Sequence, residues 1–130
     1  MTRLRLLARA VFAVLLVASL VSFLTPADDL ADPGVDDKVM HALTFLVLTL
    51  SGALAGVRWR TLAAGLAAYA VGTEVLQHVL PIGRHGDPFD ALADLVGTVL
   101  GLGVVALLAR TPRPGRRDGA GRGGVRSAPR

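Results

Sequence analysis

The sequence predicts an all-α protein, a bundle of four transmembrane helices joined by short loops, and three observations support this prediction. Of the 130 residues, 52% are hydrophobic, and the mean hydropathy is +0.55. The apolar residues come in four long blocks instead of alternating with polar residues, as they would in a soluble domain. The low aromatic content, 5%, and the abundance of Ala, Leu and Gly argue against a transmembrane barrel.

The four blocks predict helices at about residues 6–25, 39–57, 61–80 and 88–109. Each approaches the roughly 20 apolar residues that a helix needs to cross a bilayer core of about 30 Å. Prolines at positions 26, 33, 81 and 88 stand at the block ends, where Pro stops or starts a helix. The short connections favour antiparallel neighbours, so residues 1–110 are expected to form one bundle.

Both ends of the chain admit a second interpretation. Residues 111–130 are Arg, Gly and Pro with almost no apolar side chains, which predicts a disordered tail that serves as a topology signal or attracts anionic lipids. The first block starts with basic residues and ends in Thr25-Pro26-Ala27, which also fits a cleaved signal peptide. Its apolar stretch is long for a signal peptide, so we expect a retained helix.

Basic residues predict the orientation of the bundle. Twelve of the 14 Lys and Arg residues lie before the first block, between the second and third, or after the fourth. Four spans place these three groups on one side, which the positive-inside rule makes the cytoplasmic side. Both termini are then cytoplasmic in a plasma-membrane protein. The loop at residues 28–37, with five of the ten acidic residues, and the loop at residues 81–87 face outward.

Composition excludes several classes of function. The sequence pI is about 11.0, but the Arg residues flank apolar blocks, so nucleic-acid binding is not expected. The chain has no Cys, which excludes disulfides, thiol catalysis and thiolate metal sites. Membrane lipids are the expected partners, and no cofactor is expected.

Polar residues at the outer ends of the last three blocks form the candidate site. Each block is long enough to cross the bilayer only if it includes His41, Glu74 or Asp94, so these groups are expected at a similar depth. An ionisable group costs about 2.5–3.5 kcal/mol at the centre of a membrane helix and is kept when it is paired or functional. Neighbours three or four positions away share the same helix faces. The candidate binding residues are Asp37, Lys38, His41, Glu74, Gln77, Arg84, Asp87, Asp90 and Asp94.

Small residues predict close helix packing. Ala93, Gly97 and Gly101 repeat every four residues, and Gly52 and Gly56 do so in the second block. These stripes fit packing within one chain or a homodimer equally well. A mid-span Tyr69 is expected to form a hydrogen bond between helices.

Three segments carry a more specific pattern: Asp37-Lys38-x-x-His41-x-x-x-Phe45, Thr73-Glu74-x-x-Gln77, and Arg84-x-x-Asp87-x-x-Asp90-x-x-x-Asp94-x-x-Gly97-x-x-x-Gly101. In this order they resemble the VanZ-like family of small bacterial membrane proteins. The resemblance covers residues 36–102, although the family pattern more often has Asn at the position of Asp94. It implies a protein of the bacterial cell envelope. The namesake is associated with resistance to the glycopeptide antibiotic teicoplanin, but the resemblance carries no reaction with it.

The first functional hypothesis is a site that binds the head group of an envelope lipid or glycan precursor. Lys38 and Arg84 would contact phosphate or carboxylate, and Arg can do so with two hydrogen bonds. Glu74, Asp90 and His41 would form hydrogen bonds or transfer protons. Whether the protein is an enzyme stays open, because no nucleophile with a partnered base is visible.

Two other hypotheses compete with it. In a structural protein, Glu74, Gln77, Arg84 and Asp90 would only tie the third and fourth helices together. The carboxylates and His41 also suit a hard or borderline divalent ion. Because no His-x-x-x-His or Glu-x-x-His signature is present, no metal site is predicted, and His41 is expected to be a hydrogen-bonded partner.

Overall fold

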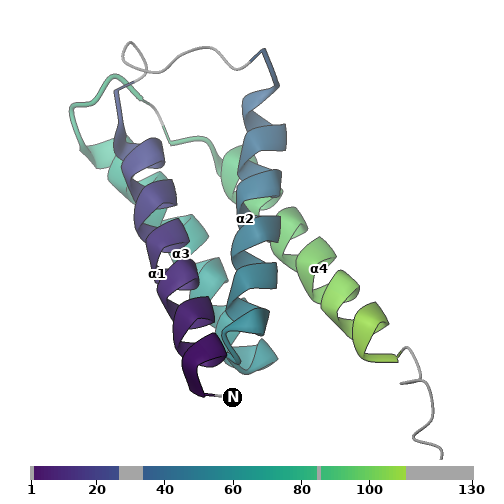
Figure 1. Cartoon of the computed structure of the whole chain (residues 1–130). Helices are drawn as coiled ribbons and strands as arrows, with labels where there is room; N and C mark the ends of the chain where they lie inside the picture. The colour runs from purple at the N-terminus through teal and green to yellow at the C-terminus, as the bar shows by residue number, and fades with distance from the viewer. Residues whose placement is uncertain (1, 27–33, 85, 111–130) are drawn as a thin grey trace, which may run out of the picture.

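The protein is a bundle of four helices, seen in a computed structural model that describes residues 2–26, 34–84 and 86–110 (Figure 1). The helices are α1 (Thr2–Leu24), α2 (Asp37–Leu54), α3 (Trp59–Val79) and α4 (Pro88–Arg110). The described residues include no strand, so the predicted all-α class is confirmed. The predicted tail and the acidic residues at positions 28–32 lie outside the described residues.

Three of the four helices, α1, α2 and α4, are long and apolar enough to cross a membrane. The third helix, α3, has 21 residues and is long enough, but it is not among the three. Its composition explains this, because Arg60 lies in its first turn and Glu74, Gln77 and His78 lie in its last two turns. The sequence therefore placed all four helices correctly, and α3 is the least apolar of the expected spans.

The helix boundaries follow from local chemistry. Asp36 caps α2, since its carboxylate accepts a hydrogen bond from the Lys38 amide at 2.9 Å. Asp87 does the same for α4 with the Phe89 amide at 2.9 Å, and Pro88 occupies the first helical position, which Pro favours. Beyond the end of α2, Gly56 has a φ of 81°, a left-handed conformation that suits Gly.

The second helix is the centre of the bundle, and its contact with α4 is the most extensive between any two helices. Glycines make this contact close. A Cβ atom on Gly97 would collide with the backbone carbonyl of Ala42, and one on Gly101 would lie 2.6 Å from the Cβ of Thr49. The predicted small-residue stripe of α4 therefore packs within the chain. The same prediction was wrong for Gly56, which follows the end of α2 and has no atom near its would-be Cβ.

Polar residues are concentrated inside the bundle and apolar residues outside, the reverse of a soluble protein. Among the described residues, ten buried ones are polar or charged, whereas the buried apolar core has seven residues and is centred on Phe45 and Leu48. Large apolar side chains such as Val14 and Val99 are exposed over much of their surface. The predicted interhelical bond of Tyr69 is confirmed, because its hydroxyl lies 2.8 Å from that of Ser19.

Candidate functional site

The two ends of the bundle carry opposite charges. All six acidic residues in the described ranges lie where α1 and α3 end and α2 and α4 begin, which we call the acidic end: Asp36, Asp37, Glu74, Asp87, Asp90 and Asp94. The opposite end, which we call the arginine end, holds six of the eight described Lys and Arg residues: Arg3, Arg5, Arg9, Arg58, Arg60 and Arg110. Figure 1 shows the first residue of α1 and the last turn of α4 at this second end.

The deepest contact at the acidic end joins α2 to α4. The Nδ1 atom of His41 lies 2.9 Å from the Oδ1 atom of Asp94, and both side chains are almost fully buried. The ring of Phe23, from the end of α1, stacks on the imidazole with the ring centres 4.5 Å apart. Phe23 thereby covers the pair from the side of α1. The second oxygen of Asp94, Oδ2, is buried and has no hydrogen-bond partner among the described residues.

A second buried carboxylate comes from α3. Glu74 accepts a 2.7 Å hydrogen bond on Oε2 from the Asp87 amide, which fixes the side chain against the start of α4. Gly86 allows this approach, since a Cβ atom there would lie 2.5 Å from the Glu74 carbonyl oxygen. The other carboxylate oxygen, Oε1, is buried without a hydrogen-bond partner in the described part of the chain. Glu74 and Asp94 thus share one pattern: one oxygen is anchored and the other is free.

Lys38 forms an outer layer above these groups. Its ammonium lies 3.0 Å from Asp87 Oδ2 and 3.2 Å from Asp90 Oδ1, so it bridges the start of α4 to the start of α2. The Phe89 amide and the Lys38 ammonium together hold the pKa of the Asp87 carboxyl below its ordinary value. Lys38 is about half exposed and Asp90 is nearly buried, so the bridge closes the site towards solvent.

The remaining candidates take different positions. Gln77 turns to α1, where its amide donates a 2.9 Å hydrogen bond to the Phe23 carbonyl and so anchors the residue that stacks on His41. Arg84 is partly buried, and its Nε is a buried donor with no partner in the described residues. The network predicted to tie α3 to α4 through Gln77 and Arg84 is therefore wrong in those two links. Asp37 is exposed beside His41.

His41 is the point where the acidic groups meet. One potential ligand atom from each of His41, Glu74 and Asp94 lies within 4.8 Å of the other two, and the same holds for Asp37, His41 and Asp90. An imidazole between carboxylates can accept, donate or relay a proton, and it can also bind a cation. The arrangement supplies hydrogen-bond acceptors in excess of donors, which suits a ligand that donates hydrogen bonds or carries positive charge.

An open groove leads to this cluster between α3 and α4. Its volume is about 500 Å³, and Glu74 and His78 supply its polar lining. Val71, Val75 and Ala91 supply much of the rest. The groove therefore joins an apolar surface to the one buried acid of α3.

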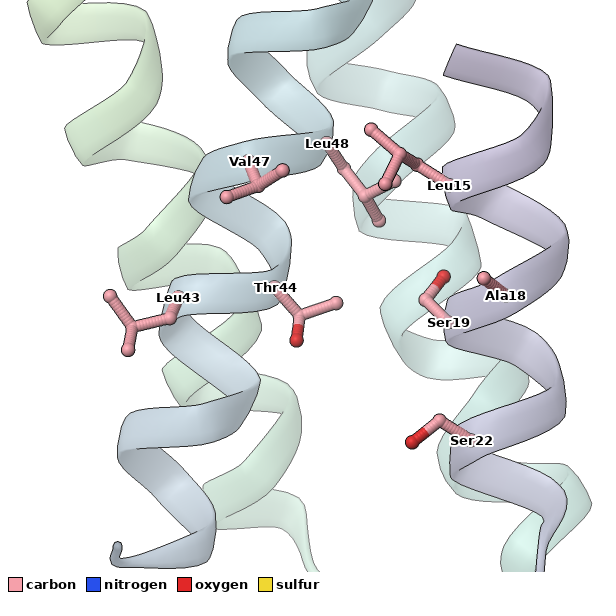
Figure 2. Close-up of a pocket in the computed structure, with 8 residues that line it drawn as sticks. All are labelled: Leu15, Ala18, Ser19, Ser22, Leu43, Thr44, Val47 and Leu48. Atoms are coloured by element: carbon pink, nitrogen blue, oxygen red, sulfur yellow. The ribbon is translucent and has the colours of Figure 1, made fainter. Parts of the chain in front are cut away.

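A second groove, of about 340 Å³, lies between α1 and α2 and differs in chemistry (Figure 2). Leu15, Leu43 and Val47 give it an apolar wall, and all eight residues that line it are uncharged. The hydroxyls of Ser19 and Thr44 are already engaged, since each donates to a backbone carbonyl of its own helix. This groove offers space but no reactive group, so the candidate site is the acidic end.

The sequence identified the residues from α2, α3 and α4 but missed the contribution of α1. Phe23 is the one residue of the site that comes from α1, and it looks in the sequence like any apolar residue near a span end. Gly86 was also missed as a packing residue, because its role depends on the path of the loop past α3. A polar residue in an apolar helix, such as Gln77, was the only signal in the sequence that this part of α3 contacts another helix.

Comparisons of the chain with protein-family models, curated proteins and solved structures find no match. The resemblance to VanZ-like proteins therefore stays a prediction that rests on the three quoted segments. The functional argument must come from the geometry of the acidic end.

Proposed function

We propose that this is a VanZ-like integral membrane protein of the cell envelope, whose acidic end binds the head group of an envelope lipid or glycan precursor. One observation carries the proposal: the groove between α3 and α4 is lined by Glu74, a buried acid with one carboxylate oxygen that has no hydrogen-bond partner among the described residues. A buried acceptor left unpaired costs about 1–3 kcal/mol, so a ligand that donates a hydrogen bond there is favoured.

The apolar surface supports membrane insertion through four helices. Three helices have the required apolar length. In α3, Glu74 and Gln77 are buried, while Val71, Val75 and Val79 face outward. The arginines of the arginine end then indicate the cytoplasmic side, with both termini there and the acidic end outside. The tail at residues 111–130 would lie on the same side.

Labelling tests this orientation directly, because the chain has no native Cys. A membrane-impermeant maleimide added to intact cells should label Val35→Cys, at the acidic end, and leave Arg58→Cys unlabelled until the cells are opened. The reverse pattern would contradict the orientation and, with it, an extracytoplasmic site.

The chemistry of the site indicates the class of head group. The acidic end has six carboxylates and two cationic side chains among its described residues, and Lys38 is already engaged with Asp87 and Asp90. Sugar hydroxyls or an ammonium group would satisfy the free oxygen of Glu74, since hydrogen bonds to charged groups are worth about 1.5–3 kcal/mol. The unpartnered Nε of Arg84 offers one donor for a phosphate. The apolar wall at Val71 and Val75 suits a hydrocarbon chain.

Binding is proposed rather than a reaction. The hydroxyls nearest to the cluster belong to Thr73 and Thr98, and each donates to a main-chain carbonyl instead of to a base. A nucleophile needs a base within hydrogen-bond reach to be activated.

A structural role is the second candidate, and the contacts of Lys38 and His41 favour it. Both residues join α2 to α4, and a cluster that only held the helices together would need these bonds. Such a cluster has no need for a groove or for free buried oxygens, and these two features favour a binding site.

Lipid binding by the purified full chain in detergent micelles distinguishes the two roles. The probes are a polyprenyl-diphosphate lipid that carries a sugar and the same lipid without the sugar, measured by native mass spectrometry with a chelator present. We expect the sugar-bearing lipid to bind more tightly, and Glu74→Gln to weaken it about 10- to 100-fold, the equivalent of roughly 1.5–3 kcal/mol.

Arg5→Ala is the matched control, since it removes an exposed charge from the arginine end. Equal binding of the two lipids, or full retention of binding in Glu74→Gln, would favour the structural role. In cells, Glu74→Gln, Arg84→Ala and Asp90→Asn should abolish an envelope phenotype at normal abundance, whereas a collapse of abundance would favour the structural role.

A further inference from the structure

The acidic end also contains a deeper cluster of three buried groups. His41, Glu74 and Asp94 come from three different helices, and their potential ligand atoms lie within 4.8 Å of one another. Ligand atoms around a tetrahedral ion with bonds of about 2.1 Å lie about 3.4 Å apart, so closing the triad on an ion requires its side chains to move inward.

Each of the two carboxylates has one oxygen already engaged. The Asp87 amide donates to Oε2 of Glu74 from outside the triad, whereas Oδ1 of Asp94 lies 2.9 Å from His41, another member of the triad. Each leaves one buried oxygen with no hydrogen-bond partner in the described ranges. Ligating carboxylates are commonly oriented by such bonds to one part of the group, which leaves the rest free for the ion.

The neighbouring triad of Asp37, His41 and Asp90 differs in both respects. Asp90 is engaged by the Lys38 ammonium at 3.2 Å, which already supplies the positive charge, and Asp37 is exposed. No protein cation is in hydrogen-bond contact with Glu74 or Asp94 among the described residues apart from His41 itself. The deeper triad is therefore the one that lacks a compensating charge.

We infer that His41, Glu74 and Asp94 bind one divalent transition-metal ion, Zn²⁺ or Mn²⁺, at the acidic end of the bundle. One imidazole nitrogen with carboxylate oxygens favours these ions over Mg²⁺ and Ca²⁺, which prefer oxygen alone. Two buried carboxylates and a neutral imidazole would balance the charge of a divalent ion. This balance also accounts for groups that are otherwise costly to bury within an apolar bundle.

Three protein ligands leave at least one coordination position open. Glu74 also lines the groove between α3 and α4, so this groove borders the triad on the side of α3. The sequence offered these three residues as possible ligands, but no metal site was predicted, because they are far apart in the chain and no short motif contains two of them.

Metal titration of the full chain in detergent, with no lipid added, tests the inference. Calorimetry with ZnCl₂ or MnCl₂ should show one ion per chain and a raised melting temperature, and MgCl₂ should show neither. His41→Gln, Glu74→Gln and Asp94→Asn should each weaken binding at least about 100-fold, since even an outer partner of a metal ligand is worth 10- to 100-fold.

Asp36→Asn is the matched control, because it removes an exposed carboxylate from the same end of the bundle. Asp37→Asn tests the neighbouring triad, and screening by solvent should keep its effect within about threefold. Loss of Zn²⁺ binding in Asp37→Asn, or wild-type affinity in Glu74→Gln and Asp94→Asn, would overturn the assignment.

X-ray absorption of the zinc-loaded wild-type chain does not depend on how the variants fold. It should show one imidazole nitrogen and otherwise oxygen at about 2.0–2.2 Å. Two or more imidazoles per ion, or no stoichiometric binding, would sink the proposal. Because the lipid measurement uses a chelator and this one uses no lipid, either proposal can fail without the other.

Discussion

The arginine end and the acidic end of this bundle differ in how deeply their charged side chains are buried. At the arginine end, all six arginines are exposed, and Arg9 reaches only a backbone carbonyl, that of Ala55, at 3.4 Å. At the acidic end, Glu74, Asp90 and Asp94 turn inward and are buried to nine-tenths or more. The two ends are built from the same four helices.

The difference shows which charges need a structural explanation. An exposed arginine beside an apolar block is satisfied by water or lipid head groups and serves orientation. A buried carboxylate has neither, so it must be paired, coordinate a cation or bind a ligand. His41 and Lys38 pair with some of the carboxylates of the acidic end. One oxygen each of Glu74 and Asp94 still has no hydrogen-bond partner among the described residues.

Removal of the His41 imidazole should give the largest effect: it should lower the free energy of unfolding by more than the removal of a charge at the arginine end. His41→Ala breaks the bond to Asp94 and the stack with Phe23, and loss of one partner of a buried charged pair costs roughly 3–5 kcal/mol. Arg5→Ala, the control at the arginine end, should change stability by less than about 0.5 kcal/mol. Reversible unfolding in mixed micelles measures both, and equal effects would erase the distinction between the ends.

Helix packing near the acidic end should give the next largest effect. Gly97→Val forces a side chain into the Ala42 backbone, and overpacking of this kind costs typically about 1–3 kcal/mol. Gly103 lies further along the same helix with open space around it, so Gly103→Val should be tolerated. The folded fraction of each variant after extraction compares the two sites, and a tolerated Gly97→Val would show that α2 and α4 do not pack this closely.

A bond in the middle of the bundle should have a smaller effect. Tyr69→Phe removes the 2.8 Å hydroxyl contact with Ser19 but keeps the ring that packs beside Phe45. Interhelical hydrogen bonds in membranes average about 0.6 kcal/mol, so we expect a loss of that order. Ser19→Ala removes the same bond from the other side, and a double mutant with additive losses would show that the two hydroxyls are not coupled.

The outer bridge of the acidic end should have the smallest effect and should depend on pH. The pKa of Asp87 is lowered in the folded protein, so its contribution to stability is present above the unfolded pKa and is lost as the pH falls through the folded one. Lys38→Met should therefore melt slightly below wild type at neutral pH. The two melting curves should approach each other only as the pH falls below the ordinary range of Asp, about pH 4, and a difference that does not shrink on further acidification would contradict the assignment.

Sequence patterns predicted the helices well because each signal is local. Apolar block lengths placed four helices, and Pro88 marked the start of α4. Residues such as Glu74 stood out because the free-energy cost of an ionisable side chain depends on its own apolar surroundings, which the block itself shows. These properties belong to single helices, so the order of residues along the chain suffices to show them.

The partners of these groups depend on how the four helices pack together, and no local sequence pattern shows this packing. Gln77 reaches α1 instead of α4, Phe23 stacks on His41, and the Glu74 carboxylate binds a backbone amide instead of Arg84. Helix rotation decides each of these contacts, because a turn of one residue moves a side chain by about 100° around the axis. The sequence determined which charges lie within the apolar helices, and the tertiary structure decided which of them remain without a partner.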